Sequence, residues 1–218
     1  MQSFVILALF CLVGWSSSQK CPAQFYKFTP RHSYCLPPRS RQFCRISRTG
    51  VSPQDKDLIL SLHNQFRSKV AMGKEQRARD GILPQAADMI QMEWDNELAA
   101  VAQKWTQNCQ WGHDCDECRA VENFAVGQNL AMQNRSCSGQ GCQKPNGEPD
   151  WTWAITALYN EIDDYYVSWL DSHFEHPGPQ TGHLTQIIWS RSWRVGCGYS
   201  FYKEGGKYHQ YYACNYGP

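Results

Sequence analysis

The sequence lacks several features that would assign it to a common class. Its formal net charge is only +1, which argues against a general nucleic-acid binder. It has no internal repeat and no low-complexity tail, and the roughly 200 residues behind the leader are enough for one domain with its own core. A Gly-x-Ser-x-Gly segment is also absent, which removes the simplest signal for a serine nucleophile.

Only one long apolar run is present, at the N-terminus. Residues 1–18 carry no charged side chain, and the apolar stretch 4–15 has the length of a signal peptide and is too short to span a bilayer. Ser16 and Ser18 supply small residues for cleavage, which would leave Gln19 as the new N-terminus. We therefore expect a secreted, extracellular protein without a transmembrane segment. An N-terminal anchor is the alternative.

Acidic residues are missing from the next segment, 19–50, which we call the N-terminal arm. The remainder of the chain is net acidic, whereas the arm contains only basic charges: Lys20, Lys27, Arg31, Arg39, Arg41, Arg45 and Arg48. Either the arm lies against the acidic body, or it contacts an anionic surface such as glycosaminoglycan or lipid headgroups. Its three cysteines and four prolines favour the first interpretation.

The cysteine count predicts a disulfide framework. The chain has eleven cysteines, and ten remain without Cys11 of the leader. An even number in a secreted chain indicates paired cysteines, here five bridges and no free thiol. Zinc is the competing interpretation, because Cys115 and Cys118 form a Cys-x-x-Cys pair to which Cys137 and Cys142 could add a second. The export signal favours oxidation.

Local sequence narrows the pairing of these cysteines. The strand-like runs 195–202 and 207–214 flank a Glu-Gly-Gly-Lys turn, so a hairpin can bring Cys197 towards Cys214. Cys137 and Cys142 flank a flexible Ser-Gly-Gln-Gly loop that could close on itself. The other six cysteines are Cys21, Cys35, Cys44, Cys109, Cys115 and Cys118. We expect them to link the arm to the body by disulfides, with Cys44–Cys109 first among these bridges. A bridge within the arm is the alternative.

Apolar spacing predicts three helices. The first begins with Ser52 as N-cap, Pro53 at the first position and Asp55 three residues after the cap, and it ends at Gly73. The second begins near Asp95, and the third follows Asp150. Their expected buried stripes are, in order, Leu58, Leu62, Phe66 and Val70; Leu98, Val101, Ala102 and Trp105; and Ile155, Leu158, Ile162, Tyr165 and Trp169. Helices followed by antiparallel strands predict an α+β fold.

One glycosylation sequon is present, at Asn134-Arg135-Ser136. It lies in a stretch rich in Gly, Pro and Ser that we interpret as a loop, where a glycan could be attached. Disulfide formation at the adjacent Cys137 would compete with glycosylation.

Four segments resemble the signature segments of the CAP superfamily (cysteine-rich secretory proteins, antigen 5 and pathogenesis-related 1). They are 108–113 (NCQWGH), 126–130 (VGQNL), 182–189 (GHLTQIIW) and 212–218 (YACNYGP), and the antigen 5 venom allergens of arthropods are the most similar branch. The resemblance implies a CAP domain over residues 51–218, built as a three-layer α-β-α sandwich with a central antiparallel sheet. A C-terminal cysteine-rich domain, found in channel-active relatives, is not expected.

The resemblance also implies a cleft with two histidines and two acidic residues. His113 and His183 match the histidines and Glu161 matches one acidic residue, whereas the other acidic position is Gln128, as in antigen 5 proteins. Two imidazoles and one carboxylate can hold a divalent ion such as zinc, but a glutamine adds only a neutral oxygen, so binding would be weak. The alternative is a polar network in which Glu161 orients the two histidines.

The function implied by the resemblance is binding without catalysis. We expect a monomer that needs no cofactor and binds small apolar ligands, such as a sterol or fatty acid, or host proteins. Leu58, Leu62 and Ile155 are candidates for lining a groove between helices. The alternative is a metal-assisted hydrolase, a peptidase or esterase, that uses the His113, Glu161 and His183 cleft. A hydroxyl such as that of Thr185 within reach of a histidine would favour it.

Overall fold

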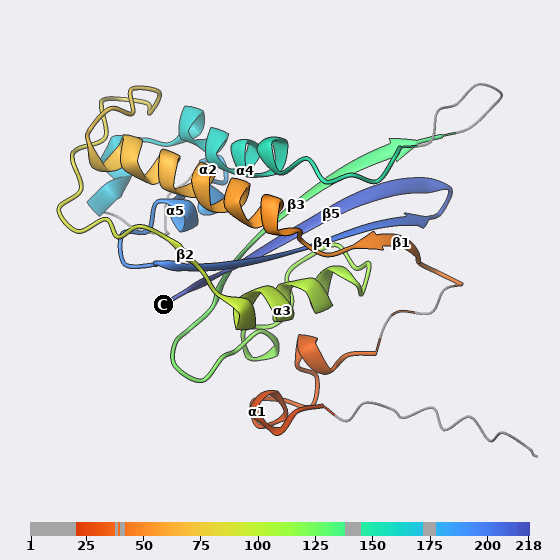
Figure 1. The fold of residues 1–218 in the computed structure, drawn as a ribbon. Coiled ribbons are helices and arrows are strands. Elements are labelled where there is room, and N and C mark those ends of the chain that lie inside the picture. The colour runs from red at the N-terminus through yellow and green to blue at the C-terminus, as the bar shows by residue number, and fades with distance from the viewer. Residues whose placement is uncertain (1–20, 38, 40–41, 138–144, 172–177) are drawn as a thin grey trace, which may run out of the picture.

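A central sheet lies between two layers of helices in the computed structural model, which describes residues 21–37, 39, 42–137, 145–171 and 178–218 (Figure 1). The strands are β1 (Arg45–Thr49), β2 (Glu93–Trp94), β3 (Gly127–Ser136), β4 (Arg194–Glu204) and β5 (Lys207–Gly217). The helices are α1 (Ala23–Tyr26), α2 (Pro53–Ala71), α3 (Asn96–Thr106), α4 (Trp151–Tyr159) and α5 (Gly182–Ile187). The 3-10 helices are η1 (Ser33–Cys35), η2 (Asp116–Cys118), η3 (Asn160–Asp164) and η4 (Val167–Asp171).

The predicted hairpin forms the centre of the sheet. Strands β4 and β5 pair antiparallel around Gly205 and Gly206, both of which have the positive φ that this turn needs. The strand order is β1-β4-β5-β3, with antiparallel neighbours throughout, and β2 adds a short parallel pairing to β4. No helix in the described ranges is long and apolar enough to cross a bilayer.

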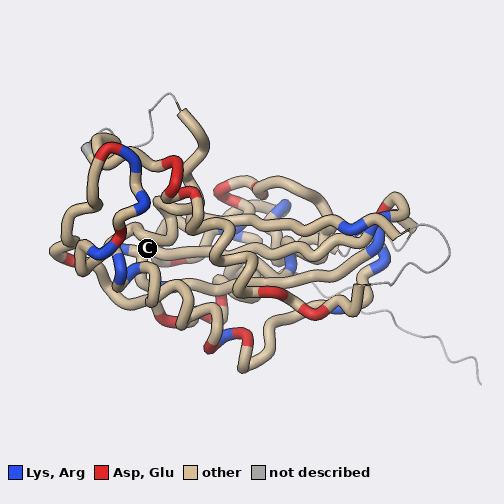
Figure 2. The backbone as a smooth tube through the Cα atoms, turned by 90° about the horizontal axis from the view of Figure 1, so that it is seen from above, with Lys and Arg blue, Asp and Glu red and all other residues tan. Residues whose placement is uncertain are grey.

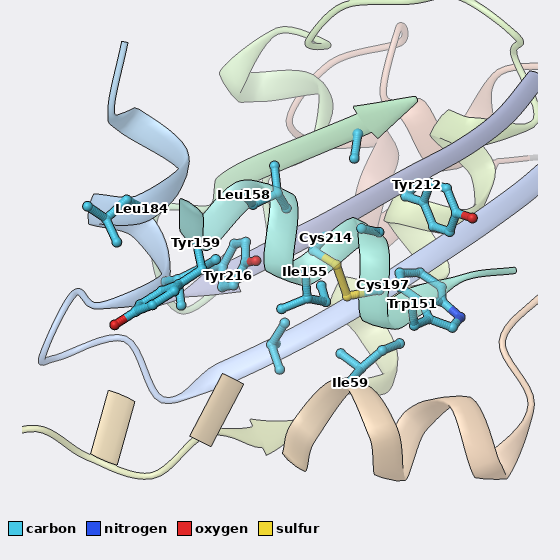
Figure 3. Close-up of a cluster of buried hydrophobic side chains, with 14 of the residues drawn as sticks. Ile59, Trp151, Ile155, Leu158, Tyr159, Leu184, Cys197, Tyr212, Cys214 and Tyr216 are labelled. Atoms are coloured by element: carbon cyan, nitrogen blue, oxygen red, sulfur yellow. A yellow bond between two sulfur atoms is a disulfide. The ribbon is translucent and has the colours of Figure 1, made fainter. Parts of the chain in front are cut away.

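Each face of the sheet has its own core. On one face, Ile59 of α2 and Ile155 of α4 are fully buried against Tyr199 and Tyr212 of the hairpin, as Figure 3 shows for part of this cluster. Full burial of one such isoleucine contributes about 1.5–3 kcal/mol. On the other face, α3 lies so close to β4 that a side chain at Gly198 would collide with the backbone of Gln103. The predicted three-layer α-β-α architecture is thereby confirmed.

Helix α2 begins as predicted but buries a different stripe. Ser52 accepts a hydrogen bond from the Asp55 amide in a complete capping box. The buried residues are Ile59, His63, Arg67 and Val70, whereas Leu58 is 39% exposed. Val70 is buried as predicted, but the rest of the predicted stripe was wrong by one residue, because His63 and Arg67 are buried with their polar groups hydrogen-bonded, and apolar spacing cannot reveal such residues.

Helix α3 follows the prediction, whereas the predicted third helix stops early. Asp95 caps α3, and all four residues of its predicted stripe are buried. Helix α4 ends at Tyr159 and is continued by 3-10 turns. Beyond the first of these turns, the Tyr165 carbonyl accepts from the Arg79 amide at 2.7 Å and the Val167 amide donates to the Arg79 carbonyl at 3.3 Å. The backbone around Tyr165 therefore pairs with another segment.

Two predicted disulfides are confirmed, and the stapled-arm model is partly wrong. Cys197 bonds to Cys214 and Cys44 bonds to Cys109. The other two described bridges are local: Cys21–Cys35 lies within the arm and Cys115–Cys118 closes the Cys-x-x-Cys pair. The predicted Cys137–Cys142 pair lies outside the described residues. One bridge, Cys44–Cys109, therefore holds the arm to the body, because the other two cysteines of the arm are bonded to each other.

Ion pairs add to that single covalent link. Lys27 pairs with Glu122 at 2.7 Å and Arg39 with Glu204 at 2.9 Å, while Arg48 contacts Glu148. These contacts agree with the interpretation that the arm lies against acidic residues of the body.

The sequon residue Asn134 is not in a loop: it belongs to β3, where its side-chain oxygen lies 2.7 Å from His209 Nδ1.

Candidate functional site

The predicted cleft residues form two separate pairs in the structure. His113 is exposed in the segment after α3, and its Nδ1 lies 2.8 Å from Oε1 of the buried Gln128 on β3. The Gln128 amide in turn donates to Oδ1 of Asn215 at 3.1 Å. Because a carboxylate could accept from His113 but could not donate to Asn215, a neutral amide suits both contacts.

His183 and Glu161 form the second pair. His183 Nδ1 lies 2.6 Å from Glu161 Oε1, and both side chains are mostly buried, with 23% and 18% exposed. Glu161 also accepts from the Leu184 amide at 3.0 Å, and Asn129 donates to the His183 carbonyl at 2.9 Å. The carboxylate thus holds both the His183 ring and the first turn of α5.

These two pairs approach β3 from opposite sides. Gln128 and Asn129 are consecutive strand residues, and consecutive side chains point to opposite faces of a sheet. No group of three or more His, Cys, Asp or Glu side chains that could hold a metal ion occurs in the described part of the chain. The residues as arranged do not fit the three-ligand divalent site. Their geometry is that of a polar network in which Glu161 orients His183 and Gln128 orients His113.

The hydroxyl that could have served as a nucleophile is engaged elsewhere. Thr185 Oγ1 donates to the Gly182 carbonyl at 3.0 Å within α5. The side-chain partners of the two imidazoles are Gln128 and Glu161. The hydroxyl–imidazole contact that a hydrolase needs is therefore not formed by Thr185.

A hollow lies next to the α5 segment that carries His183. A cavity of about 580 Å³, here called the α2–α5 cavity, is enclosed by the end of α2, residues 83–89, η4 and the α5 segment through Ser190. Much of its wall is apolar: Val70, Leu83, Met89, Tyr165, Trp169 and Ile188. The predicted groove residues Leu58, Leu62 and Ile155 do not line it. Ile155 is instead fully buried in the core.

The segment with the signature GHLTQIIW supplies one wall of this cavity. Leu184 and Ile187 are buried in the core, whereas Trp189 is 40% exposed. Gly182, Thr185 and Trp189 also line a second cavity of about 560 Å³, on the side of residues 116–127. The α5 segment therefore lies between two hollows, and Gly182, Thr185 and Trp189 line both of them.

A buried arginine fixes the backbone of that wall. Arg67 of α2 is only 1% exposed, and its guanidinium donates to the carbonyls of Ile187, Trp189 and Ser190 at 2.7–3.1 Å. A further bond runs from Nε to the Ile90 carbonyl at 3.0 Å. Burial lowers the pKa of Arg67 to about 10, so it stays charged at neutral pH. The sequence analysis did not single out Arg67, because the sequence shows only an arginine next to the expected apolar stripe.

Comparison with known proteins agrees with this architecture. The model of the cysteine-rich secretory protein (CAP) family matches residues 60–216. The chain is 42% identical to "CRISP/Allergen/PR-1" of Trittame loki, over 98% of this chain and 50% of that protein, and 41% identical to "Venom allergen 5" of Tityus serrulatus, over 98% and 48%. It thus spans about half the length of these relatives. Venom allergen 3 of Solenopsis invicta is 38% identical over 85% of this chain and 76% of that protein.

Solved structures show the same fold. The crystal structure of Na-ASP-1 matches 84% of this chain and 43% of its own, with 29% identity and a TM-score of 0.64. The structure of NaASP2 with Zn²⁺ matches 78% and 82%, with a TM-score of 0.58, and at 24% identity it supports the fold alone. With the family model matched over most of its length, the chain belongs to the cysteine-rich secretory protein (CAP) family.

Proposed function

We propose that this chain is a secreted, venom allergen-like protein that acts by binding and not by catalysis, and that its ligand is a small apolar molecule in the α2–α5 cavity. The cavity itself carries the proposal. Its volume of about 580 Å³ lies within the range of roughly 300–1,000 Å³ that ligand pockets occupy, and its apolar wall suits a hydrocarbon. The disulfides and the names of the relatives support secretion.

The charge of the lining favours a neutral ligand. No lysine or arginine is found among the described residues that line the cavity, and Asp88 is its acidic member. A fatty-acid carboxylate would enter an apolar site without a cation and near a negative charge, which is unfavourable. A hydroxyl could instead bond to neutral polar groups such as Gln85 and Gln180. We therefore propose a sterol or a long-chain alcohol as the ligand of the cavity, in preference to a fatty acid.

The hydrolase alternative has less support. Thr185 donates to a backbone carbonyl, and the His183 ring is held by Glu161. Recognition of a host protein is the alternative within the binding class, and it would remain if no apolar ligand bound.

The test compares two adjacent alanines. Ala86 lines the cavity and Ala87 does not. Ala86→Trp should fill part of the cavity and weaken binding of hexadecanol or cholesterol at least tenfold, about 1.4 kcal/mol, whereas Ala87→Trp should leave it unchanged. Equilibrium dialysis with labelled ligand measures both. Equal affinity for the two variants would show that the ligand binds elsewhere.

The charge argument has its own test. Asp88→Lys should raise the affinity for palmitate relative to hexadecanol at pH 7, because it replaces a negative charge in the lining by a positive one. Asp57→Lys, which makes the same change at an exposed position of α2 outside the cavity, is the control. If the unmodified protein prefers palmitate, the assignment to a neutral ligand fails while the cavity assignment stands.

A further inference from the structure

Strand register gathers positive side chains at the end of the sheet that carries the β4–β5 turn. Arg45 of β1 is opposite Lys203 of β4, Lys203 is opposite Tyr208 of β5, and Tyr208 is opposite Arg135 of β3. Residues directly opposite one another point to the same face of a sheet. These four residues, here called the basic row, therefore cross four neighbouring strands, a span of about 14 Å at the usual strand spacing.

A β-bulge adds a fourth cation to this face. The pairing of β1 with β4 shifts between Ile46 and Arg48, so Arg48 is opposite Phe201 although it lies three residues after Arg45. Without the extra residue, side chains three positions apart would point to opposite faces. The bulge thus brings Arg45 and Arg48 to the same side of the sheet.

The row is not neutralised by the protein itself. Arg48 contacts Glu148 and Arg39 pairs with Glu204, so the neighbouring acidic side chains already have partners. Arg45, Lys203 and Arg135 are exposed, and in the described ranges none of them forms an ion pair. Two cations directly opposite each other, as Arg45 and Lys203 are, destabilise a sheet. An anionic ligand would relieve that repulsion.

The surroundings of the row favour a linear ligand. Helices α2 and α4 cover the same face further along, and the strands extend beyond their ends (Figure 1). Figure 2 shows lysine and arginine positions gathered at this end of the sheet. A flat membrane would be held off by helices about 10 Å thick, whereas a chain can lie across the strands. Tyr208, stacked on Phe201 at 5.7 Å and below Lys203 Nζ at 5.2 Å, gives the row an aromatic floor.

We propose that the basic row binds a sulfated glycosaminoglycan, whose sulfate groups contact Arg45, Lys203 and Arg135. A glycan on the sequon would not block this site, because Asn134 precedes Arg135 in the strand and points to the opposite face. The site is separate from the α2–α5 cavity, so its occupancy and that of the cavity can be measured independently.

The test is heparin binding by the full chain, measured by surface plasmon resonance. Three sulfate contacts give a salt slope of about 2, so raising NaCl from roughly 50 to 200 mM should weaken binding about twentyfold. The combined variant Arg45→Gln, Lys203→Gln and Arg135→Gln should bind at least about tenfold more weakly at low salt and lose most of the salt dependence. Desulfated heparin should not bind.

A charge-matched control separates site from net charge. The combined variant Arg31→Gln, Lys74→Gln and Arg191→Gln removes three exposed cations away from the row and should keep heparin affinity. Unchanged thermal unfolding of both variants checks that the fold is intact. Equal weakening by the two variants, or an unaffected row variant, would overturn the proposal. It would also be overturned if vesicles of phosphatidylserine and phosphatidylcholine, and not heparin, were the ligand that the row variant loses.

Discussion

Substitution of Glu75 by glutamine should make the free energy of unfolding less dependent on pH in the acidic range. Glu75 is fully buried just after α2, and its carboxylate accepts from Tyr159 Oη at 2.7 Å, from the Arg77 amide at 3.0 Å and from Lys69 Nζ at 2.8 Å. The contacts tie the end of α2 to α4. A glutamine of similar size removes the negative charge and keeps the shape.

The magnitude follows from the pKa of this group. Burial by itself would raise the pKa of Glu75, but the hydrogen bonds from Lys69, Tyr159 and the Arg77 backbone lower it from 4.5 to about 2. A folded-state pKa below the unfolded one stabilises the protein above pH ~4.5, and this stability is lost as the pH falls towards 2. The pKa shift corresponds to a contribution of about 3 kcal/mol to the free energy of unfolding at pH 7, of which about 0.4 kcal/mol remains at pH 2.

The assay is urea unfolding at several pH values with the disulfides intact. The unfolding free energy of the parent protein minus that of Glu75→Gln should be about 3 kcal/mol near pH 7 and should shrink between pH 4.5 and 2. Glu93→Gln, at an exposed glutamate that forms no ion pair in the described part of the chain, controls for general charge effects. A difference that stays constant across this range would refute the reasoning.

Three further predictions concern the cap, the arm and the cleft. Ser52→Ala should lower the unfolding free energy by about 1 kcal/mol because it removes the capping box, as thermal unfolding can measure. The double substitution Cys44→Ser and Cys109→Ser should cost about 2–4 kcal/mol and make the arm the first site of limited proteolysis, since this is the described bridge between arm and body; unchanged cleavage would contradict the single-tether arrangement. Gln128→Glu should leave any zinc binding seen by calorimetry unchanged, because His113, Glu161 and His183 do not come together as a three-ligand site in the described structure; a tightened affinity would show that position 128 belongs to a metal site.

Local signals predicted the parts of the fold that depend on neighbouring residues. The Ser52 cap, the buried stripe of α3 and the Cys197–Cys214 hairpin are each set by residues a few positions apart or by one turn. The stripe of α2 was missed because His63 and Arg67 are buried by distant partners. His63 Nε2 lies 2.9 Å from the Tyr216 hydroxyl, which is 153 residues away in the chain.

The candidate site shows the same limit. Resemblance named His113, Gln128, Glu161 and His183, and the structure pairs them two by two, but the pairing depends on the facing of consecutive residues of β3. The face of the sheet to which each β3 side chain points can be assigned only once the register of β3 with β5 is known. The α2–α5 cavity could not be predicted, because segments that are unrelated in sequence enclose it and the apolar residues in its wall resemble those of any core.

The buried Arg67 has a consequence for how this protein can diversify. Its guanidinium donates hydrogen bonds to the main-chain carbonyls of Ile187, Trp189 and Ser190. Every residue type has a main-chain carbonyl. The hydrogen bonds by which Arg67 holds the cavity wall consequently do not depend on which side chains stand at 188 and 189. Substitutions at these positions can therefore be used to change the lining of the cavity while the hydrogen bonds from Arg67 to the main chain persist.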